Sequence, residues 1–165
     1  MKKMLIVYYS LSNGNTERIA EVLKQETGAY IARIETEKPY TGSCDEIVEQ
    51  GQREVRAKFE PTILPLSKNV ADYDVIAVGS PTWWYTMAPA VRSFLKNADL
   101  AGKTVVPFTT NGGYPGKEIE DMSALCVGAT IAFPMRVRFD STVGDKLETP
   151  IEKIEEWARR VAQNL

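Results

Sequence analysis

The sequence contains no histidine, and this absence excludes several kinds of site. Nucleophile systems of the Ser-His-Asp and Cys-His types need an imidazole base, and no metal site with a histidine ligand can form. We therefore expect no catalytic triad and no metal centre. Only two cysteines occur, Cys44 and Cys126, so a disulfide framework is not indicated. Their scarcity favours a reducing compartment, and we expect a cytoplasmic protein.

Strong charge and long apolar runs are also missing. The formal net charge of the 165 residues is −2, which provides no basic field for nucleic acid or for an anionic membrane. No apolar run reaches the roughly 18 residues that a transmembrane helix needs. The apolar stretch after Met1-Lys2-Lys3 ends after about six residues, which is too short for a signal peptide. Length and composition indicate one domain over residues 1–165, and we expect a monomer or weak dimer.

Strand-like and helix-like segments alternate along the chain. The apolar runs predict strands at 4–9, 29–34, 74–79, 103–109 and 131–139. The amphipathic segments predict helices at 16–27, 45–59, 87–97 and 116–126, followed by a C-terminal helix. This alternation predicts an α/β fold, in which a single doubly wound parallel sheet of five strands is covered by helices on both faces.

Individual residues mark the ends and faces of these elements. Gly28 is expected to end the first helix in the left-handed conformation. Thr149 is expected to cap the last helix, with Glu152 as the acid of a capping box. Arg136 and Arg138 alternate with apolar residues in the last strand, and we expect them to form its solvated face at a sheet edge.

A polar run directly follows the first expected strand and leads into the first helix. The first N–H groups of a helix have no intrahelical partner, and the helix dipole adds partial positive charge, so this position favours an anion. The run has no Lys or Arg and lacks the Gly-Lys-Ser/Thr ending of a Walker loop, which indicates one phosphate on a small cofactor. The candidate ligands are Ser10, Ser12, Asn13, Gly14, Asn15 and Thr16, with either serine as the leading hydroxyl donor. The alternative is a polar turn that only caps the helix.

Two further loops follow the third and fourth expected strands. Ligands in open α/β sheets bind outside the carboxyl ends of strands, so these loops belong with the polar run. The first of them offers flat aromatic faces for a planar ligand, through Pro81, Thr82, Trp83, Trp84 and Tyr85. The second lets backbone N–H and C=O groups approach a ligand edge, at Thr110, Asn111, Gly112, Gly113, Tyr114 and Gly116. Together the three loops predict a site for a phosphorylated planar heterocycle.

The aromatic residues divide between binding and structural interpretations. One of Trp83 and Trp84 is expected to stack on the ligand and the other to be structural, because one ring covers one face of a planar ligand. Tyr114 either stacks, forms a hydrogen bond or is simply exposed.

The three loops, in this order, resemble those of the flavodoxin-like family. Gly14-Asn15-Thr16 matches the end of the family's phosphate loop, and Pro81-Thr82-Trp83-Trp84 matches the Pro-x-Trp-Trp loop of its short bacterial branch. Residues 109–116 match the third flavin loop. The resemblance covers essentially the whole chain and implies a flavodoxin-like three-layer sandwich with strand order 2-1-3-4-5. It also implies FMN, bound without a covalent link.

The sequence departs from the family pattern in two places. The phosphate loop is one residue longer, with Asn13 where Thr is usual. Residues 80–91 and 109–116 contain no Asp or Glu, whereas low-potential flavodoxins carry acids there. Fewer acids mean less repulsion of an anionic reduced flavin, which makes two-electron reduction easier.

The resemblance implies electron transfer by the flavin, without catalytic side chains of the protein's own. The first interpretation is an electron carrier between redox partner proteins, because no separate nicotinamide-binding motif is present. The alternative is an NAD(P)H-dependent oxidoreductase that reduces a small quinone, which the missing acids favour. A third interpretation is a flavin-binding module without redox function.

Overall fold

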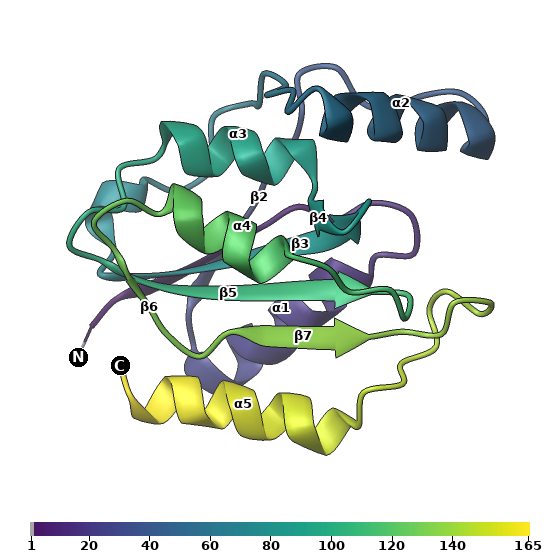
Figure 1. Cartoon of the computed structure of the whole chain (residues 1–165). Coiled ribbons are helices and arrows are strands. Elements are labelled where there is room, and N and C mark those ends of the chain that lie inside the picture. The colour runs from purple at the N-terminus through teal and green to yellow at the C-terminus, as the bar shows by residue number, and fades with distance from the viewer. Residues whose placement is uncertain (1) are drawn as a thin grey trace.

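The computed structural model describes residues 2–165, and its central feature is a mostly parallel sheet with helices on both faces (Figure 1). The strands are β1 (Met4–Tyr8), β2 (Tyr30–Arg33), β3 (Val75–Trp83), β4 (Thr86–Met87), β5 (Thr104–Asn111), β6 (Thr130–Ile131) and β7 (Met135–Arg138). The α-helices are α1 (Asn15–Thr27), α2 (Cys44–Arg56), α3 (Pro89–Asn97), α4 (Glu118–Leu125) and α5 (Ile151–Gln163). None of these helices within residues 2–165 combines the length and the apolar character that crossing a membrane requires.

The strand order confirms the predicted doubly wound topology. Neighbouring strands run β2-β1-β3-β5-β6, and every pairing on this path is parallel. The sheet has seven strands rather than the five expected, for two local reasons. β4 is a short antiparallel return on the end of β3, and the fifth expected strand is divided into β6 and β7, which both pair with β5. The division falls at Phe133, whose φ is +50°, and at Pro134, which cannot donate to a ladder.

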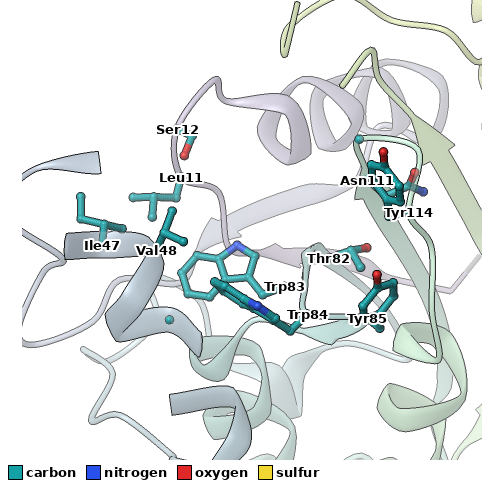
Figure 2. Close-up of a pocket in the computed structure, with 12 residues that line it drawn as sticks. Leu11, Ser12, Ile47, Val48, Thr82, Trp83, Trp84, Tyr85, Asn111 and Tyr114 are labelled. Carbon is teal, nitrogen blue, oxygen red and sulfur yellow. The ribbon is translucent and has the colours of Figure 1, made fainter. Parts of the chain in front are cut away.

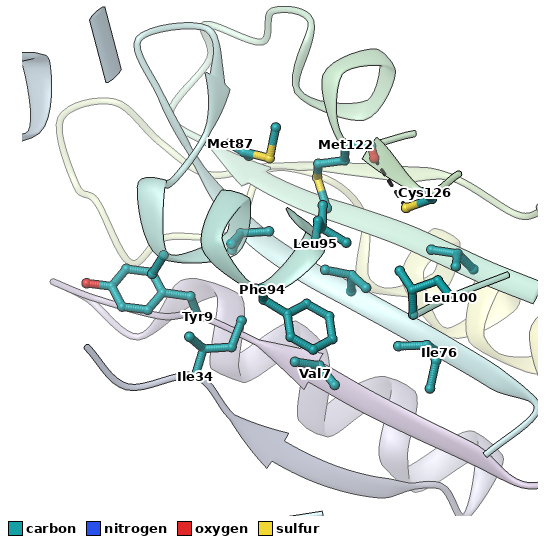
Figure 3. Packing of buried hydrophobic residues seen from close by; sticks show 14 of the residues in the cluster. Val7, Tyr9, Ile34, Ile76, Met87, Phe94, Leu95, Leu100, Met122 and Cys126 are labelled. Atoms are coloured by element: carbon teal, nitrogen blue, oxygen red, sulfur yellow. Dashed lines mark hydrogen bonds between the residues drawn. The ribbon is translucent and has the colours of Figure 1, made fainter. Parts of the chain in front are cut away.

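Two apolar cores hold the helices on the sheet. On one face, α1 and α5 share a buried cluster with alternate side chains of the central strands, such as Ile6. On the other face, Phe94 of α3 and Met122 of α4 belong to the cluster that contains Val7 and Ile76 (Figure 3). Successive side chains of a strand point to opposite faces, so β1 supplies both cores and is buried along its whole length. The loops at the carboxyl ends therefore start from a rigid frame.

The start of α5 differs from the prediction. The helix begins at Ile151, after Pro150, and no side chain caps it. The hydroxyl of Thr149 instead accepts a hydrogen bond from the backbone N–H of Arg138, with 2.7 Å between the two heavy atoms. The predicted cap is wrong because the end of β7 uses the same acceptor. The other predicted helix end is correct, since Gly28 follows α1 with a φ of +70°.

Helix α2 is the least buried of the long helices. Its N-terminus has the capping box that α5 lacks, formed by Ser43 and Glu46. Of its 13 residues only Gly51 is buried. In Figure 1 this helix lies at the upper right, on the same side of the sheet as α3 and α4. Its apolar side chains, including the half-exposed Val48, are thus available to line a site rather than the core.

Candidate functional site

Three loops meet at the carboxyl ends of β1, β3 and β5, which are neighbours in the sheet. We call residues 10–16 the first loop, 81–85 the second loop and 110–116 the third loop. A polar cleft of about 150 Å³ is lined by residues of all three loops. An aromatic cleft of about 390 Å³ adjoins it, since both clefts share Ser12, Thr82, Trp83 and Asn111. The structure thus brings together the three segments that the sequence predicted to form one site.

The first loop separates the roles of its two serines. Ser10 is 2% exposed, and its hydroxyl accepts the N–H of Glu17 at 3.2 Å between the heavy atoms. Ser12 has a φ of +57° and lines both clefts. Gly14 follows with a φ of +71°, and its N–H donates to the carbonyl of Leu11. Ser10 therefore stabilises the start of α1, whereas Ser12 faces the cleft.

A hydroxyl pair joins the first loop to the third. The Oγ1 atoms of Thr16 and Thr110 lie 2.8 Å apart, and both residues are buried. One hydroxyl donates to the other, so the accepting hydroxyl keeps its own proton for a ligand. Thr16 also lies in the first turn of α1, where backbone N–H groups have no intrahelical partner. Hydroxyl and N–H donors thus converge at one end of the polar cleft, as an anion site requires.

The second loop is a tight hairpin with an uncommon sequence. Trp83 pairs with Thr86, so Trp84 and Tyr85 alone form the turn between β3 and β4. Their φ values are +46° and +66°, the pattern of a type I′ turn, in which Asn and Gly are the usual residues. Bulky residues in this region cost about 1–3 kcal/mol each. Strain of this kind occurs at functional sites, and here it brings two aromatic side chains to the aromatic cleft.

The two adjacent tryptophans have different surroundings (Figure 2). Trp83 packs edge-to-face against Tyr9 and Tyr40, with ring centroids 6.1 and 5.3 Å apart, and contacts the core. Trp84 is 36% exposed, and one of its edges lies over Gly51 of α2, where an added Cβ would be 3.2 Å from the ring. Trp83 is thus fixed by Tyr9, Tyr40 and the core, while Trp84 remains partly exposed.

A buried carboxylate that the sequence interpretation missed holds the third loop in place. Glu118 is fully buried, and its carboxylate accepts the N–H of Gly116 and the Nε–H of Arg136, both at 2.7 Å. Gly116 lies directly against the second loop, because an added Cβ would be 2.3 Å from the carbonyl oxygen of Tyr85. The N–H of Lys117 donates to that same oxygen at 2.8 Å. The second and third loops are therefore locked together.

Arg136 is exposed, as predicted for the solvated face of the last strand, but its guanidinium also forms ion pairs that the sequence does not indicate. Burial opposes the charge of the guanidinium, but hydrogen bonds to Glu118 and Glu120 outweigh it and raise the pKa of Arg136. Arg138, two residues further along β7, is largely exposed and pairs with Glu148 at 2.6 Å. Strand alternation places both arginines on one face but does not reveal that α4 presents a carboxylate to the first of them.

No charged residue lines either cleft within the described residues 2–165. The acids that follow the first and third loops are engaged elsewhere: Glu17 pairs with Arg33, Glu118 binds Arg136, and Asp121 accepts the hydroxyl of Thr86 at 2.6 Å. Burial raises the pKa of Tyr9, which packs behind Trp83, to about 12, so its phenol stays neutral near pH 7. The site is thus a neutral cavity with hydrogen-bond donors at one end and aromatic rings at the other.

Most predicted site residues line the clefts, and four do not. The residues that line at least one cleft are Ser12, Asn13, Asn15, Thr16, Pro81, Thr82, Trp83, Trp84, Tyr85, Thr110, Asn111, Gly112 and Tyr114. The four that shape the backbone without lining a cleft are Ser10, Gly14, Gly113 and Gly116.

Two segments that the sequence interpretation missed also contribute. Ile47, Val48 and Gly51 of α2 form a wall of the aromatic cleft (Figure 2). The sequence indicated an amphipathic helix in this long crossover segment, but not that its apolar side would line the site. Residues 140–146 lie beside the first loop, where the carbonyl of Gly144 accepts the side-chain amide of Asn15 at 2.7 Å. No local pattern in the sequence indicates this second contact.

The fold and the site define a doubly wound α/β protein with a cleft at the topological switch point between β1 and β3. Within this class, the chain belongs to the flavodoxin family, because a family model described as Flavodoxin matches residues 3–153.

Individual relatives agree with this assignment. NAD(P)H dehydrogenase (quinone) 3 of Rhizobium meliloti (strain 1021) is 28% identical, over 87% of this chain and 74% of its own length. A crystal structure assigned as a flavoprotein, from Bacteroides eggerthii DSM 20697, is 26% identical with a TM-score of 0.74, over 98% of this chain and 99% of that chain. The flavoprotein of Lactobacillus acidophilus NCFM, solved in complex with FMN, is 24% identical with a TM-score of 0.69, over 82% of this chain and 93% of that chain.

Proposed function

We propose that the protein binds FMN without a covalent link and uses it to transfer electrons. The observation that carries this proposal is the continuity of the polar cleft, with its hydroxyl and N–H donors, and the aromatic cleft. A phosphate suits the first, and a planar ring suits the second. Membership of the flavodoxin family supports FMN, as does the bound FMN of the Lactobacillus acidophilus protein, which shares the fold.

An unpaired atom of the site fits this ligand. Thr82 Oγ1 is buried and has no hydrogen-bond partner within residues 2–165, and Thr82 lines both clefts. A buried hydroxyl without a partner costs about 1–3 kcal/mol. A polar group of a ligand that spans the two clefts removes this cost. FMN has such polar groups between its phosphate and its ring.

Each loop then has a separate role in holding FMN. Ser12, Thr16 and the first N–H groups of α1 would hold the phosphate, and Trp84 and Tyr114 would cover the ring. Backbone groups of the third loop would meet the ring edge, because glycine permits a close approach there. FMN supplies the redox chemistry when bound, while the protein binds it, orients it and limits the access of water.

The rim of the aromatic cleft supports electron exchange with a partner protein. Trp84, Tyr85 and Tyr114 are 36%, 59% and 67% exposed, and all three line the cleft. Exposed apolar groups that gather in one place mark interaction surfaces. A redox partner docked on this rim would approach the ring directly, so we propose an electron carrier as the first candidate.

A second candidate follows from the wall formed by α2. Ile47 and Val48 face the aromatic cleft and enclose space on the side opposite the third loop. This wall suits a small planar acceptor next to the ring. The name of the Rhizobium meliloti relative supports NAD(P)H as the donor and a quinone as the acceptor. A reducing, cytoplasmic location is part of both candidates, supported by the free thiols of Cys44 and Cys126.

One experiment separates the two candidates. The purified chain loaded with FMN is titrated anaerobically with dithionite and, separately, mixed with NADPH or NADH and benzoquinone. A carrier should be reduced in two resolved one-electron steps and should not oxidise NAD(P)H. An oxidoreductase should be reduced in one two-electron step and should oxidise more than one equivalent of NAD(P)H per FMN only when quinone is present to re-oxidise the flavin. A chain that retains no FMN after gel filtration would contradict both.

A further inference from the structure

A separate cavity lies outside the site described above. It has a volume of about 330 Å³, is bounded by α2, β4, α3 and α4, and shares no lining residue with either cleft. Glu54 and Val55, near the end of α2, line it, whereas Ile47, Val48 and Gly51 of the same helix line the aromatic cleft. We call it the lateral cavity. Its size is within the range of small-molecule sites, about 300–1,000 Å³.

The lateral cavity contains a cation with one buried donor that is not satisfied. The Nε atom of Arg92 is buried and has no hydrogen-bond partner within residues 2–165. None of the ion pairs formed by these described residues includes Arg92 or the other cation of the cavity, Lys58. A buried donor without an acceptor is costly, and a charged one more so. The arrangement is therefore incomplete unless a ligand provides an acceptor.

The acids of the lateral cavity do not fill this role. Both carboxylate oxygens of Glu54 already accept hydrogen bonds, from the hydroxyl of Tyr40 and from the side-chain amide of Gln50. Asp121 accepts the hydroxyl of Thr86. The acids are thus held by neutral donors, while the guanidinium of Arg92 forms no ion pair with either of them.

The position of Arg92 on its helix also favours an anion. α3 begins at Pro89, so Arg92 lies near its first turn, at the positive end of the helix dipole. A cation at this end does not stabilise a helix, whereas an anion bound there gains from both charges. The remaining lining is mainly apolar and includes Phe59, which is 48% exposed, Met87 and Leu125.

We propose that the lateral cavity binds a small-molecule monocarboxylate with an apolar tail. The planar fork of an arginine matches a carboxylate in two parallel hydrogen bonds. The formal charges of the lining cancel, because it has two cations and two acids. The cavity therefore tolerates a ligand with one negative charge better than a ligand with two. The tail covers Phe59 and Leu125, which removes their apolar surface from water.

The test is a titration of the full chain, with FMN added, followed by backbone-amide NMR. The probes are sodium hexanoate, its neutral analogue hexanamide and hexyl phosphate. Hexanoate should shift the amide signals of Lys58, Arg92 and Leu125 and leave those of Asn111 and Tyr114 in place. Hexanamide should bind at least about tenfold more weakly, because it lacks the charge that Arg92 pairs with. This comparison needs no variant and does not depend on whether FMN binds.

Two variants assign the effect to Arg92. Arg92→Gln should weaken hexanoate binding at least about tenfold, while the matched control Lys96→Gln, which removes an exposed charge from the same helix, should not. Both variants should keep the amide spectrum of a folded chain. The proposal is overturned by equal binding of hexanamide, by tighter binding of hexyl phosphate, by shifts confined to the two clefts, or by unchanged binding to folded Arg92→Gln.

Discussion

Replacing Thr16 by valine tests the phosphate end of the site. Valine keeps the shape of threonine, so the change removes one hydroxyl and adds no bulk. In the native chain this hydroxyl lies 2.8 Å from that of Thr110, in surroundings where the two residues are 1% and 5% exposed. Without it, Thr110 loses its partner and the proposed phosphate loses a donor. A loss of about 1–3 kcal/mol is expected, which is about a 5- to 150-fold increase in the dissociation constant of FMN.

The assay is a titration of cofactor-free protein into FMN, followed by the quenching of flavin fluorescence. The fold should survive, because Ile19 and Leu23 of α1 stay buried in the core whatever the residue at position 16. A loss of one hydrogen bond, about 1 kcal/mol, lowers the melting temperature of a chain of this size by about 2–4 °C. The change in affinity should therefore exceed the change in stability.

Thr27→Val is the matched control. Its hydroxyl donates to the carbonyl of Leu23 at 2.7 Å, at the other end of the same helix. This variant should show a similar loss of stability and an unchanged dissociation constant for FMN. An unchanged dissociation constant in Thr16→Val, or an equal loss in both variants, would refute the assignment of Thr16 to the phosphate site.

Three more predictions concern the ring end of the site. Trp84→Ala should weaken FMN binding and restore the fluorescence of the flavin, with little effect on unfolding by urea. Trp83→Ala should lower the free energy of unfolding by about 3 kcal/mol, since Tyr9 packs against Trp83. The opposite result would exchange the roles of the two tryptophans. Gly116→Ala should weaken FMN binding in the same titration, because its Cβ would displace Tyr85, and native affinity would contradict this contact. The midpoint potential of bound FMN should change little with added salt in a potentiometric titration, because both clefts are neutral; a steep rise would point to control by exposed acids.

The sequence was sufficient for the sheet and for the three loops, and physical reasons explain why. Apolar strands such as Val75–Trp83 are recognisable because both faces are buried, and loops at the ends of neighbouring parallel strands must meet. Where the sequence signal lies within a few residues, as at Gly28, the prediction was accurate.

Features that depend on distant partners were not predictable. Glu118 and Arg136 lie 18 residues apart, and neither the helix pattern nor the strand pattern contains their ion pair. Thr149 has the sequence of a helix cap, but the backbone of Arg138, 11 residues earlier, binds its hydroxyl. The assignment of Ser10 to the helix and of Ser12 to the cleft likewise depended on backbone angles that the sequence of the loop does not express.

The measurement that tests the proposed site most directly is the affinity of the cofactor-free chain for FMN, riboflavin and FAD. Riboflavin lacks the phosphate and FAD extends it, while the ring is the same in all three. If the first loop holds one phosphate with hydroxyl and N–H donors, FMN should bind at least about 100-fold more tightly than riboflavin, because several charge-assisted hydrogen bonds are lost together. FMN should also bind much more tightly than FAD. Equal affinity for FMN and riboflavin would contradict the assignment of the first loop as the anchor of the cofactor.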